Sequence, residues 1–228
     1  MNEIIRKRKS IRKFDKAVLD DESLENVKLQ ITKLIPLFPD IKYSVEIVSK
    51  TKGIFGIKAP HYLAFYGEIN KDIYVNIGYI GQQMDLFFSE CGLGSCWLGV
   101  AKPDEKEFNN MPCIITMAFG KPAQSLYRDV SEFKRKLLSD ISEGLDNRLE
   151  AARLAPSGMN KQNWYFIVDN GKIHCYRKKS LLGFMDNMTC IDIGIAIYHI
   201  AVETDGFTFS IDTTPPVRDG YIYVGTAG

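Results

Sequence analysis

Two long apolar segments, each too hydrophobic to expose a broad face to water, constrain most strongly how this chain folds. Residues 75–92 carry apolar side chains at helical spacing, namely Ile77, Ile80, Met84, Phe87, Phe88 and Cys91. Residues 191–206 form a second largely apolar helical segment. Neither approaches the roughly 18 uninterrupted apolar residues of a membrane span. We therefore expect two helices at the centre of the molecule.

Shorter elements surround these helices in an order that occurs twice. Periodicity and flanking residues predict helices at 19–35 and 146–156, and strands at 42–49, 61–67, 112–120, 164–168, 172–177, 207–213 and 220–225. Residues 33–50 align with 153–170 at an offset of 120 (153 − 33), sharing Leu, Pro, Ile and Val. Residues 76–78 align with 192–194 at an offset of 116 (192 − 76). We interpret the chain as an internal duplication, with halves at 1–133 and 134–228 that form one compact domain.

Each half carries a polar motif that the other lacks. The first half has a basic arm, residues 8–14, with alternating Arg8, Ser10 and Arg12. The second half has a loop, residues 155–164, that contains Ser157, Gly158 and Asn160. Their counterparts in the first half are Leu37, Phe38 and Asp40, which make the first copy of the loop blank. If the halves pack as pseudo-twofold partners, the arm of one meets the loop of the other and forms a single composite site.

The residue types in the arm and the loop suit a flat polar ligand with an anionic end. Arginines that flank a hydroxyl can bind one phosphate through charge-assisted, bidentate hydrogen bonds. In the loop, Pro156 fixes the turn and Gly158 admits close approach, while Ser157 and Asn160 supply hydrogen-bonding groups. A solvated charge run and an ordinary loop are the alternatives for the two motifs.

Composition excludes several other classes of protein. The 29 Lys and Arg residues against 28 Asp and Glu give a net charge of +1, which favours neither nucleic acid nor an anionic membrane as partner. Five cysteines without paired spacing indicate reduced core thiols in a cytoplasmic protein. The three histidines lack metal-ligand spacing, so we expect no metal site. Neither a dinucleotide-binding fingerprint nor a P-loop is present.

Four segments carry a family resemblance: "RKSIRKF" (8–14), "GLGSCWLG" (92–99), "AFGKP" (118–122) and "APSGMNKQNW" (155–164). They resemble the signature segments of the nitroreductase-like flavoprotein family. The resemblance implies an α+β fold with two mainly antiparallel sheets, each with a long central helix. It covers most of the chain. About 130 residues separate the arm from the loop, which resembles the TM nitroreductase type, in which one chain mimics the usual homodimer and works as a monomer.

The resemblance also implies FMN as cofactor and NADH or NADPH as electron donor. The residues that match FMN-binding positions are Arg8, Lys9, Ser10, Arg12, Leu98, Gly99, Arg128, Pro156, Ser157, Gly158 and Asn160. The backbone at Leu98 and Gly99 would lie near flavin N5, and Arg128 would be a further phosphate ligand. One departure is Asn163, where the family usually has proline.

The expected activity is hydride transfer through the flavin to a nitroaromatic, quinone or similar small acceptor. No catalytic side chain is required, because the cofactor carries the redox chemistry. One alternative is a non-catalytic FMN-binding protein for flavin storage or sensing. Another is an FMN-fragmenting or dehalogenating relative, by analogy of fold. The physiological acceptor and the choice between NADH and NADPH stay open.

Overall fold

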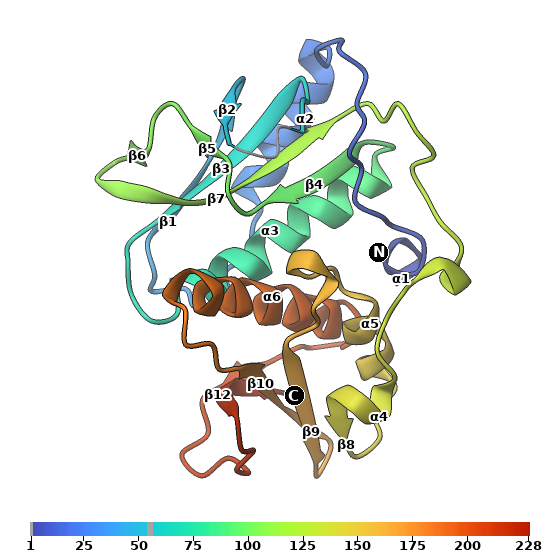
Figure 1. The fold of residues 1–228 in the computed structure, drawn as a ribbon, viewed down its shortest axis with the longest axis vertical. Helices are drawn as coiled ribbons and strands as arrows, with labels where there is room; N and C mark the ends of the chain where they lie inside the picture. The colour runs from blue at the N-terminus through green and yellow to red at the C-terminus, as the bar shows by residue number, and fades with distance from the viewer. Residues whose placement is uncertain (1, 54–56) are drawn as a thin grey trace.

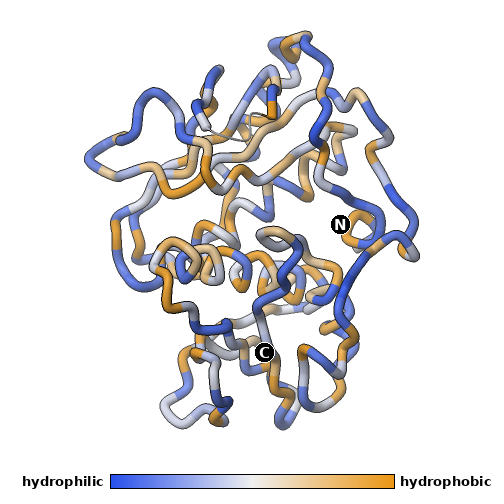
Figure 2. The backbone as a smooth tube through the Cα atoms, in the orientation of Figure 1, coloured by the Kyte–Doolittle hydropathy of each residue, from blue (hydrophilic) through white to orange (hydrophobic). Residues whose placement is uncertain are grey.

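Two long helices cross at the centre of the molecule, and each carries a β-sheet on its outer side (Figure 1). The computed structural model describes residues 2–53 and 57–228. The helices are α3 (Ile73–Glu90) and α6 (Gly183–Val202), at or near the apolar segments predicted to be central. Hydrophobic colouring is concentrated in these helices and in the central strands of the first sheet (Figure 2). The layers therefore run from the first sheet through α3 and α6 to the second sheet.

The first half forms an antiparallel sheet against α3. Its elements are α1 (Asn2–Ile5), α2 (Asp21–Thr32), β1 (Tyr43–Val48), β2 (Thr51–Lys52), β3 (His61–Gly67), β4 (Gly94–Leu98), β5 (Lys102–Pro103), β6 (Glu107–Phe108) and β7 (Met111–Gly120). The main sheet has the order β1-β3-β7-β4, with β6 paired to β7, while β2 and β5 form a separate pair. Asp20 caps α2 by accepting a hydrogen bond from Ser23 N at 2.8 Å.

The second half forms a five-stranded sheet against α6. After η1 (Val130–Glu132), at the end of the first half, its elements are α4 (Leu138–Ile141), β8 (Ser142–Glu143), α5 (Arg148–Leu154), η2 (Gly158–Asn160), β9 (Trp164–Asp169), β10 (Lys172–Lys178), β11 (Phe209–Ser210) and β12 (Tyr221–Ala227). The strand order is β11-β12-β10-β9-β8, antiparallel except for the β8–β9 pair. The expected α+β fold with two mainly antiparallel sheets is confirmed.

The two central helices approach each other through glycines at equivalent positions. An added Cβ at Gly78 would lie 2.1 Å from the Ile191 carbonyl oxygen, and one at Gly194 would lie 2.0 Å from the Val75 carbonyl oxygen. The offset of 116 relates Gly78 to Gly194 and Val75 to Ile191, so these two contacts are reciprocal. Reciprocal contacts are what a twofold relation between halves produces.

Two further contacts recur between the halves. Asn76 Oδ1 accepts hydrogen bonds from Leu37 N and Phe38 N, and Asp192 Oδ1 accepts one from Gly158 N. The offsets of 116 for the helices and 120 for the loops relate Asn76 to Asp192 and Phe38 to Gly158. The same helix position therefore holds the same loop in both halves. Near the arm, Arg128 N donates to Lys7 O, and a β-bridge joins Arg8 to Tyr127.

Several expectations from sequence need correction. Helix α6 begins at Gly183, eight residues before the apolar segment, and only Phe209–Ser210 of the predicted strand 207–213 pair as a strand. Phe87 is half-buried, whereas its neighbour Phe88 is fully buried. All five cysteines are free, but Cys91 is exposed and does not belong to the core. Among the described residues, no helix has the length and hydropathy to cross a membrane.

Candidate functional site

A cavity of about 350 Å³ lies where the two halves meet. The arm and the segment from β4 to Ala101 line it from the first half. The loop and the first turns of α6 line it from the second half. Its volume is at the lower end of the range for small-molecule sites, about 300 to 1,000 Å³. A cavity therefore lies at the place where the split motifs predict a composite site.

The structure brings most of the predicted site residues together. Those that line the cavity are Ser10, Arg12, Leu98, Gly99, Pro156, Ser157 and Gly158. Arg8, Lys9, Arg128 and Asn160 are not among its lining residues. The arm is held against β4 because Ile11 N donates to Ser95 O at 2.8 Å. This strand-like contact places Ser10 and Arg12, on either side of Ile11, at the cavity.

The loop holds an unusual backbone conformation. Met159, Asn160 and Gln162 have φ angles of 51°, 56° and 50°, in the left-handed region that non-glycine residues rarely adopt. Each such residue costs about 1 to 3 kcal/mol and needs support from its surroundings. Support comes from Ser157 Oγ, which accepts from Gln162 N at 2.9 Å, and from Gln162 Oε1, which accepts from Lys136 N at 2.8 Å. These hydrogen bonds fix the conformation of the loop, which forms one wall of the cavity.

Apolar side chains of α6 and β4 form the rest of the wall. Phe184, Met185 and Met188 come from the start of α6, and Trp97 comes from β4. Trp97 also stacks on Phe65, with ring centroids 5.7 Å apart. Such a wall suits a flat aromatic ring. The start of α6 was missed in the sequence because polar residues interrupt its hydrophobic pattern.

Asp192 is a cavity residue that the sequence analysis did not select. It is 5% exposed, and its Oδ1 accepts a hydrogen bond from Gly158 N at 2.8 Å. Burial raises the pKa of Asp192 to about 7, although the Gly158 hydrogen bond and the nearby Lys161 oppose the rise. The alignment of the two halves could have indicated Asp192, because it places an acidic residue where the blank half has the neutral Asn76.

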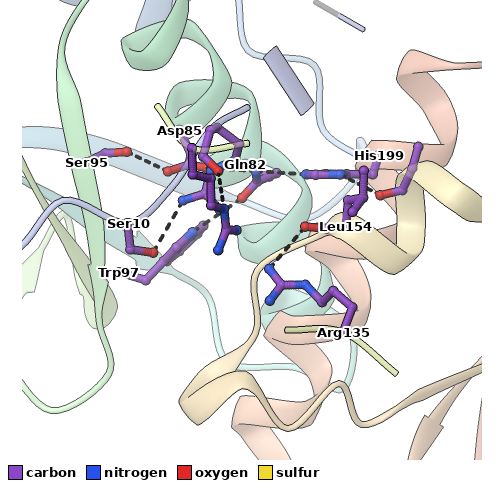
Figure 3. A network of polar contacts seen from close by, with 11 residues as sticks. Ser10, Gln82, Asp85, Ser95, Trp97, Arg135, Leu154 and His199 are labelled. Atoms are coloured by element: carbon purple, nitrogen blue, oxygen red, sulfur yellow. Dashed lines mark hydrogen bonds and ion pairs between the residues drawn. The ribbon is translucent and has the colours of Figure 1, made fainter. Parts of the chain in front are cut away.

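Arg8 lies behind the cavity in a buried polar network. Arg8 Nε is 2.9 Å from Asp85 Oδ2, with both side chains 1% exposed. Asp85 also accepts from Ser95 Oγ at 2.5 Å and from Gln82 Nε2 at 2.9 Å. Figure 3 shows this network continuing from Gln82 to His199 on α6. The network therefore joins both halves beneath the arm.

His199 is neutral within this network. Burial lowers the pKa of His199 to about 3, with a further lowering from Arg8 and Arg135. Gln82 Nε2 lies 3.0 Å from His199 Nε2, so the amide donates to an unprotonated ring nitrogen. His199 Nδ1 then donates to Ala151 O at 2.9 Å. Nε2 thus joins α6 to Gln82 of the first half and Nδ1 joins α6 to α5, so both ring nitrogens have structural partners and the residue needs no catalytic role to explain it.

Asn160 binds the segment that joins β7 to α4 (residues 121–137, the joining segment), whereas Arg128, which belongs to this segment, binds the arm. Arg128 Nε donates to Arg8 O at 3.1 Å. Asn160 Nδ2 donates to Lys134 O at 2.7 Å, and Asn160 Oδ1 accepts from Arg135 Nη1 at 2.5 Å. The loop and the joining segment are therefore tied together at one end of the site.

The comparisons with known proteins agree with this fold. The family model described as "Putative TM nitroreductase" matches residues 1–204. The crystal structure of a putative nitroreductase from Thermotoga maritima has a TM-score of 0.69 at 18% identity, covering 99% of this chain and 91% of that chain. A nitroreductase family protein from Clostridium difficile gives a TM-score of 0.49 at 18% identity, covering 61% of this chain and 95% of that chain. Among curated proteins there is no match.

Proposed function

The chain belongs to the TM nitroreductase family, and from this premise we propose that it is an FMN-dependent NAD(P)H oxidoreductase. Family membership supports a flavin oxidoreductase in general. The finer proposal is that hydride passes from NADH or NADPH through FMN to a nitroaromatic, quinone or similar acceptor. The observation that carries it is the cavity in which the arm of one half faces the loop of the other.

The residues present fit a flavin at both ends of the site. Met185, Met188 and Trp97 offer apolar surface for the ring. Gly158 lines the cavity with backbone alone, and the position of an added Cβ would lie in ordinary contact with Asp192 Oδ1, at 3.7 Å. Arg12 lines the cavity, with Arg8 just behind Ser10, and guanidinium groups suit a phosphate or an electron-rich ring edge.

Bound FMN would supply the redox chemistry, with N5 as the atom that accepts the hydride. The protein's own residues bind, orient and exclude water. Leu98 and Gly99 present backbone at the wall from the first half, and Ser157 and Gly158 do so from the second. Met188 lies 3.4 Å from where a Cβ at Gly99 would be, so these two walls nearly touch. No protein acid or base is needed for the hydride step.

We further propose that one chain replaces the usual homodimer. The reciprocal contacts at Gly78 and Gly194, and the matched hydrogen bonds of Asn76 and Asp192, support this proposal. In the blank half, Phe38 packs edge-on against Phe209 at 5.8 Å and contributes to the core. We infer that the side chains of this loop occupy the space where a second site would otherwise lie. One complete site per monomer follows.

Anaerobic mixing of the purified yellow protein with NADH and, separately, with NADPH tests the function. We expect loss of the oxidised flavin absorbance with at least one donor, followed by its return when a quinone or nitroaromatic is added. A flavin-loaded protein that neither donor reduces would favour the alternative, a non-catalytic FMN-binding protein. A protein that binds no flavin would remove the proposed function altogether.

A further inference from the structure

A second cavity lies on the outer face of the second sheet, away from the site between the halves. Its volume is about 350 Å³, and its wall is formed by β10, the turn between β9 and β10 and the loop between β11 and β12. Ile173 and Cys175 of β10 belong to the same hydrophobic core as the buried residues of α6. His174 lies between them and therefore points to the opposite face of the sheet. The sheet thus separates this cavity from α6 and from the proposed flavin site (Figure 1).

His174 is fixed in the wall of this cavity by a chain of hydrogen bonds. Its Nδ1 lies 2.8 Å from Thr226 Oγ1 and 3.5 Å from Asp212 Oδ2. Thr226 Oγ1 also lies 2.6 Å from the Tyr223 hydroxyl and 3.0 Å from Asp212 Oδ2. The Tyr223 hydroxyl in turn accepts from Asp212 N at 3.0 Å. Strand β12 and the loop before it therefore hold the imidazole ring from one side.

The positions of the protons in this chain follow from the hydrogen bonds. A carboxylate only accepts, so the single hydroxyl proton of Thr226 is donated to Asp212. Thr226 Oγ1 must then accept from its two other neighbours, the Tyr223 hydroxyl and His174 Nδ1. The Nδ1 atom of His174 therefore carries a proton. In the neutral ring, the other nitrogen, Nε2, has a lone pair that can accept a hydrogen bond.

Two polar groups at this cavity lack the partners that their chemistry calls for. His174 is 6% exposed and lines the cavity, and within residues 2–53 and 57–228 its Nε2 has no hydrogen-bond partner. Asp212 also lines the cavity, and no Lys or Arg in the described part of the chain forms an ion pair with its carboxylate. A buried acceptor beside a carboxylate without a cationic partner favours a ligand that brings N–H donors and positive charge.

The remaining charged groups of the lining leave the cavity net negative. Asp169 and Lys172 lie where β9 turns into β10, and both are exposed. Together with Asp212 the lining carries two carboxylates against one ammonium group. An exposed lysine extends its ammonium group into water, whereas the charge of Asp212 is held beside the His174 ring. A cation that enters the cavity therefore meets more negative than positive charge.

We propose that this cavity is a second binding site and that its ligand is a small organic amine. The ammonium group of the ligand donates to His174 Nε2 and lies beside the Asp212 carboxylate. Hydrogen bonds from a charged donor are stronger than those between neutral groups, and the ammonium group supplies both the missing donor and the missing charge. The site lies apart from the proposed flavin site and does not depend on the proposed function.

Three probes of equal chain length test the class of ligand: 1,4-diaminobutane, 1,4-butanediol and succinate. Each is titrated into the full-length chain at constant ionic strength and followed by isothermal titration calorimetry. We expect the diamine to bind with a Kd of about 1 mM or lower, and the other two to bind at least about tenfold more weakly. A preference for succinate would overturn the proposal, because the His174 ring would then act as a cation. Absence of diamine binding up to about 10 mM overturns it as well.

Asp212→Asn tests the role of the carboxylate. The asparagine still accepts from Thr226 but has no charge, so we expect the Kd for the diamine to rise about tenfold or more. Asp219→Asn is the matched control, because Asp219 is an exposed residue of the same loop that does not line the cavity. It should change the Kd less than about twofold. Equal effects of the two variants would show that the diamine is attracted by surface charge alone, and would reject the site.

The His174 ring of the wild-type chain gives a test that needs no variant. Long-range proton–nitrogen NMR spectra distinguish a protonated from an unprotonated ring nitrogen. In the presence of the diamine we expect Nδ1 to be protonated and Nε2 to be unprotonated, with an Nε2 signal that shifts along the binding curve measured by calorimetry. A protonated Nε2 in the complex, or an Nε2 signal that the diamine does not move, contradicts the proposal.

Discussion

At the scale of single residues, Asp192 makes the stability of the protein depend on pH. Its pKa is raised from an ordinary 3.8 to about 7 in the folded state, so the folded protein holds a proton that the unfolded chain releases. Stability is therefore fully present below about pH 4 and falls as pH rises toward 7. Above about pH 7 this contribution of Asp192 to the free energy of unfolding is lost completely. Lys161, which also lines the cavity, lowers the pKa of Asp192 and so moderates the effect.

We predict that Asp192→Asn is more stable than wild type above pH 7, by about 1 to 4 kcal/mol. An asparagine still accepts the Gly158 hydrogen bond but does not titrate. The gain should grow between about pH 4 and 7 and then stay constant, as measured by urea unfolding across that range. Asn76→Asp is the control in the blank half, where loss of the Nδ2 donor to Phe38 O should destabilise. A gain in Asp192→Asn that is the same at every pH contradicts the prediction.

The arm shows how far single site residues could be predicted from sequence. Arg8, Ser10 and Arg12 alternate, and the pattern alone treats the two arginines alike. The structure separates them, because Arg12 lines the cavity while Arg8 pairs with Asp85 on α3. Asp85 was read only as part of an apolar helix. Ion pairs between distant segments leave no local signal in the sequence.

At the scale of elements, the central helices were predictable and their boundaries were not. Helix α3 lies within two residues of its predicted span because its apolar residues are continuous. Helix α6 starts early at a polar stretch in which Asp186 accepts from Arg177 Nη1 at 2.6 Å and from Ser180 N at 3.0 Å. These tertiary bonds hold the first turns of α6. Since those turns line the cavity, a wall of the site depends on contacts that periodicity cannot reveal.

The helix crossing gives a prediction at the same scale. Gly78→Ala and Gly194→Ala should each destabilise the protein by about 1 to 3 kcal/mol, because the new methyl group meets a backbone carbonyl at close to 2 Å. The loss occurs although alanine favours helices over glycine by about 1 kcal/mol. Chemical unfolding measures this decrease in the free energy of unfolding.

Gly183→Ala serves as the control within α6. A Cβ at Gly183 meets nothing within 4 Å, so this variant should be as stable as wild type or slightly more stable. If Gly78→Ala and Gly194→Ala matched Gly183→Ala, the close approach of the two helices would be wrong. Unequal losses of stability in Gly78→Ala and Gly194→Ala would mean that the two halves relax to different extents where the helices cross.

At the scale of the whole molecule, the proposed duplication rests in the sequence on weak identity alone. Four identities between residues 33–50 and 153–170 gave the alignment of the two halves at an offset of 120. Two hydrogen bonds support the proposal, since Asn76 accepts from Phe38 N and Asp192 accepts from Gly158 N, at positions that the alignment relates. The blank loop is closed by Leu37 and Phe38, which pack against the core. The loop with Ser157 and Gly158 instead leaves a cavity.

The last prediction concerns stoichiometry. Because the arm belongs to one half and the loop to the other, the chain should bind one FMN as a monomer. Light scattering combined with flavin absorbance measures the number of chains per particle and the number of FMN molecules per chain. Ser157→Leu should lose most of the flavin by filling the cavity wall, whereas the reverse change, Leu37→Ser in the blank loop, should retain it. Residues 1–133 and 134–228 expressed separately should bind none, because each would expose its half of the α3–α6 contact. Two FMN per chain, or FMN bound only by an association of two chains, would overturn the single-chain site.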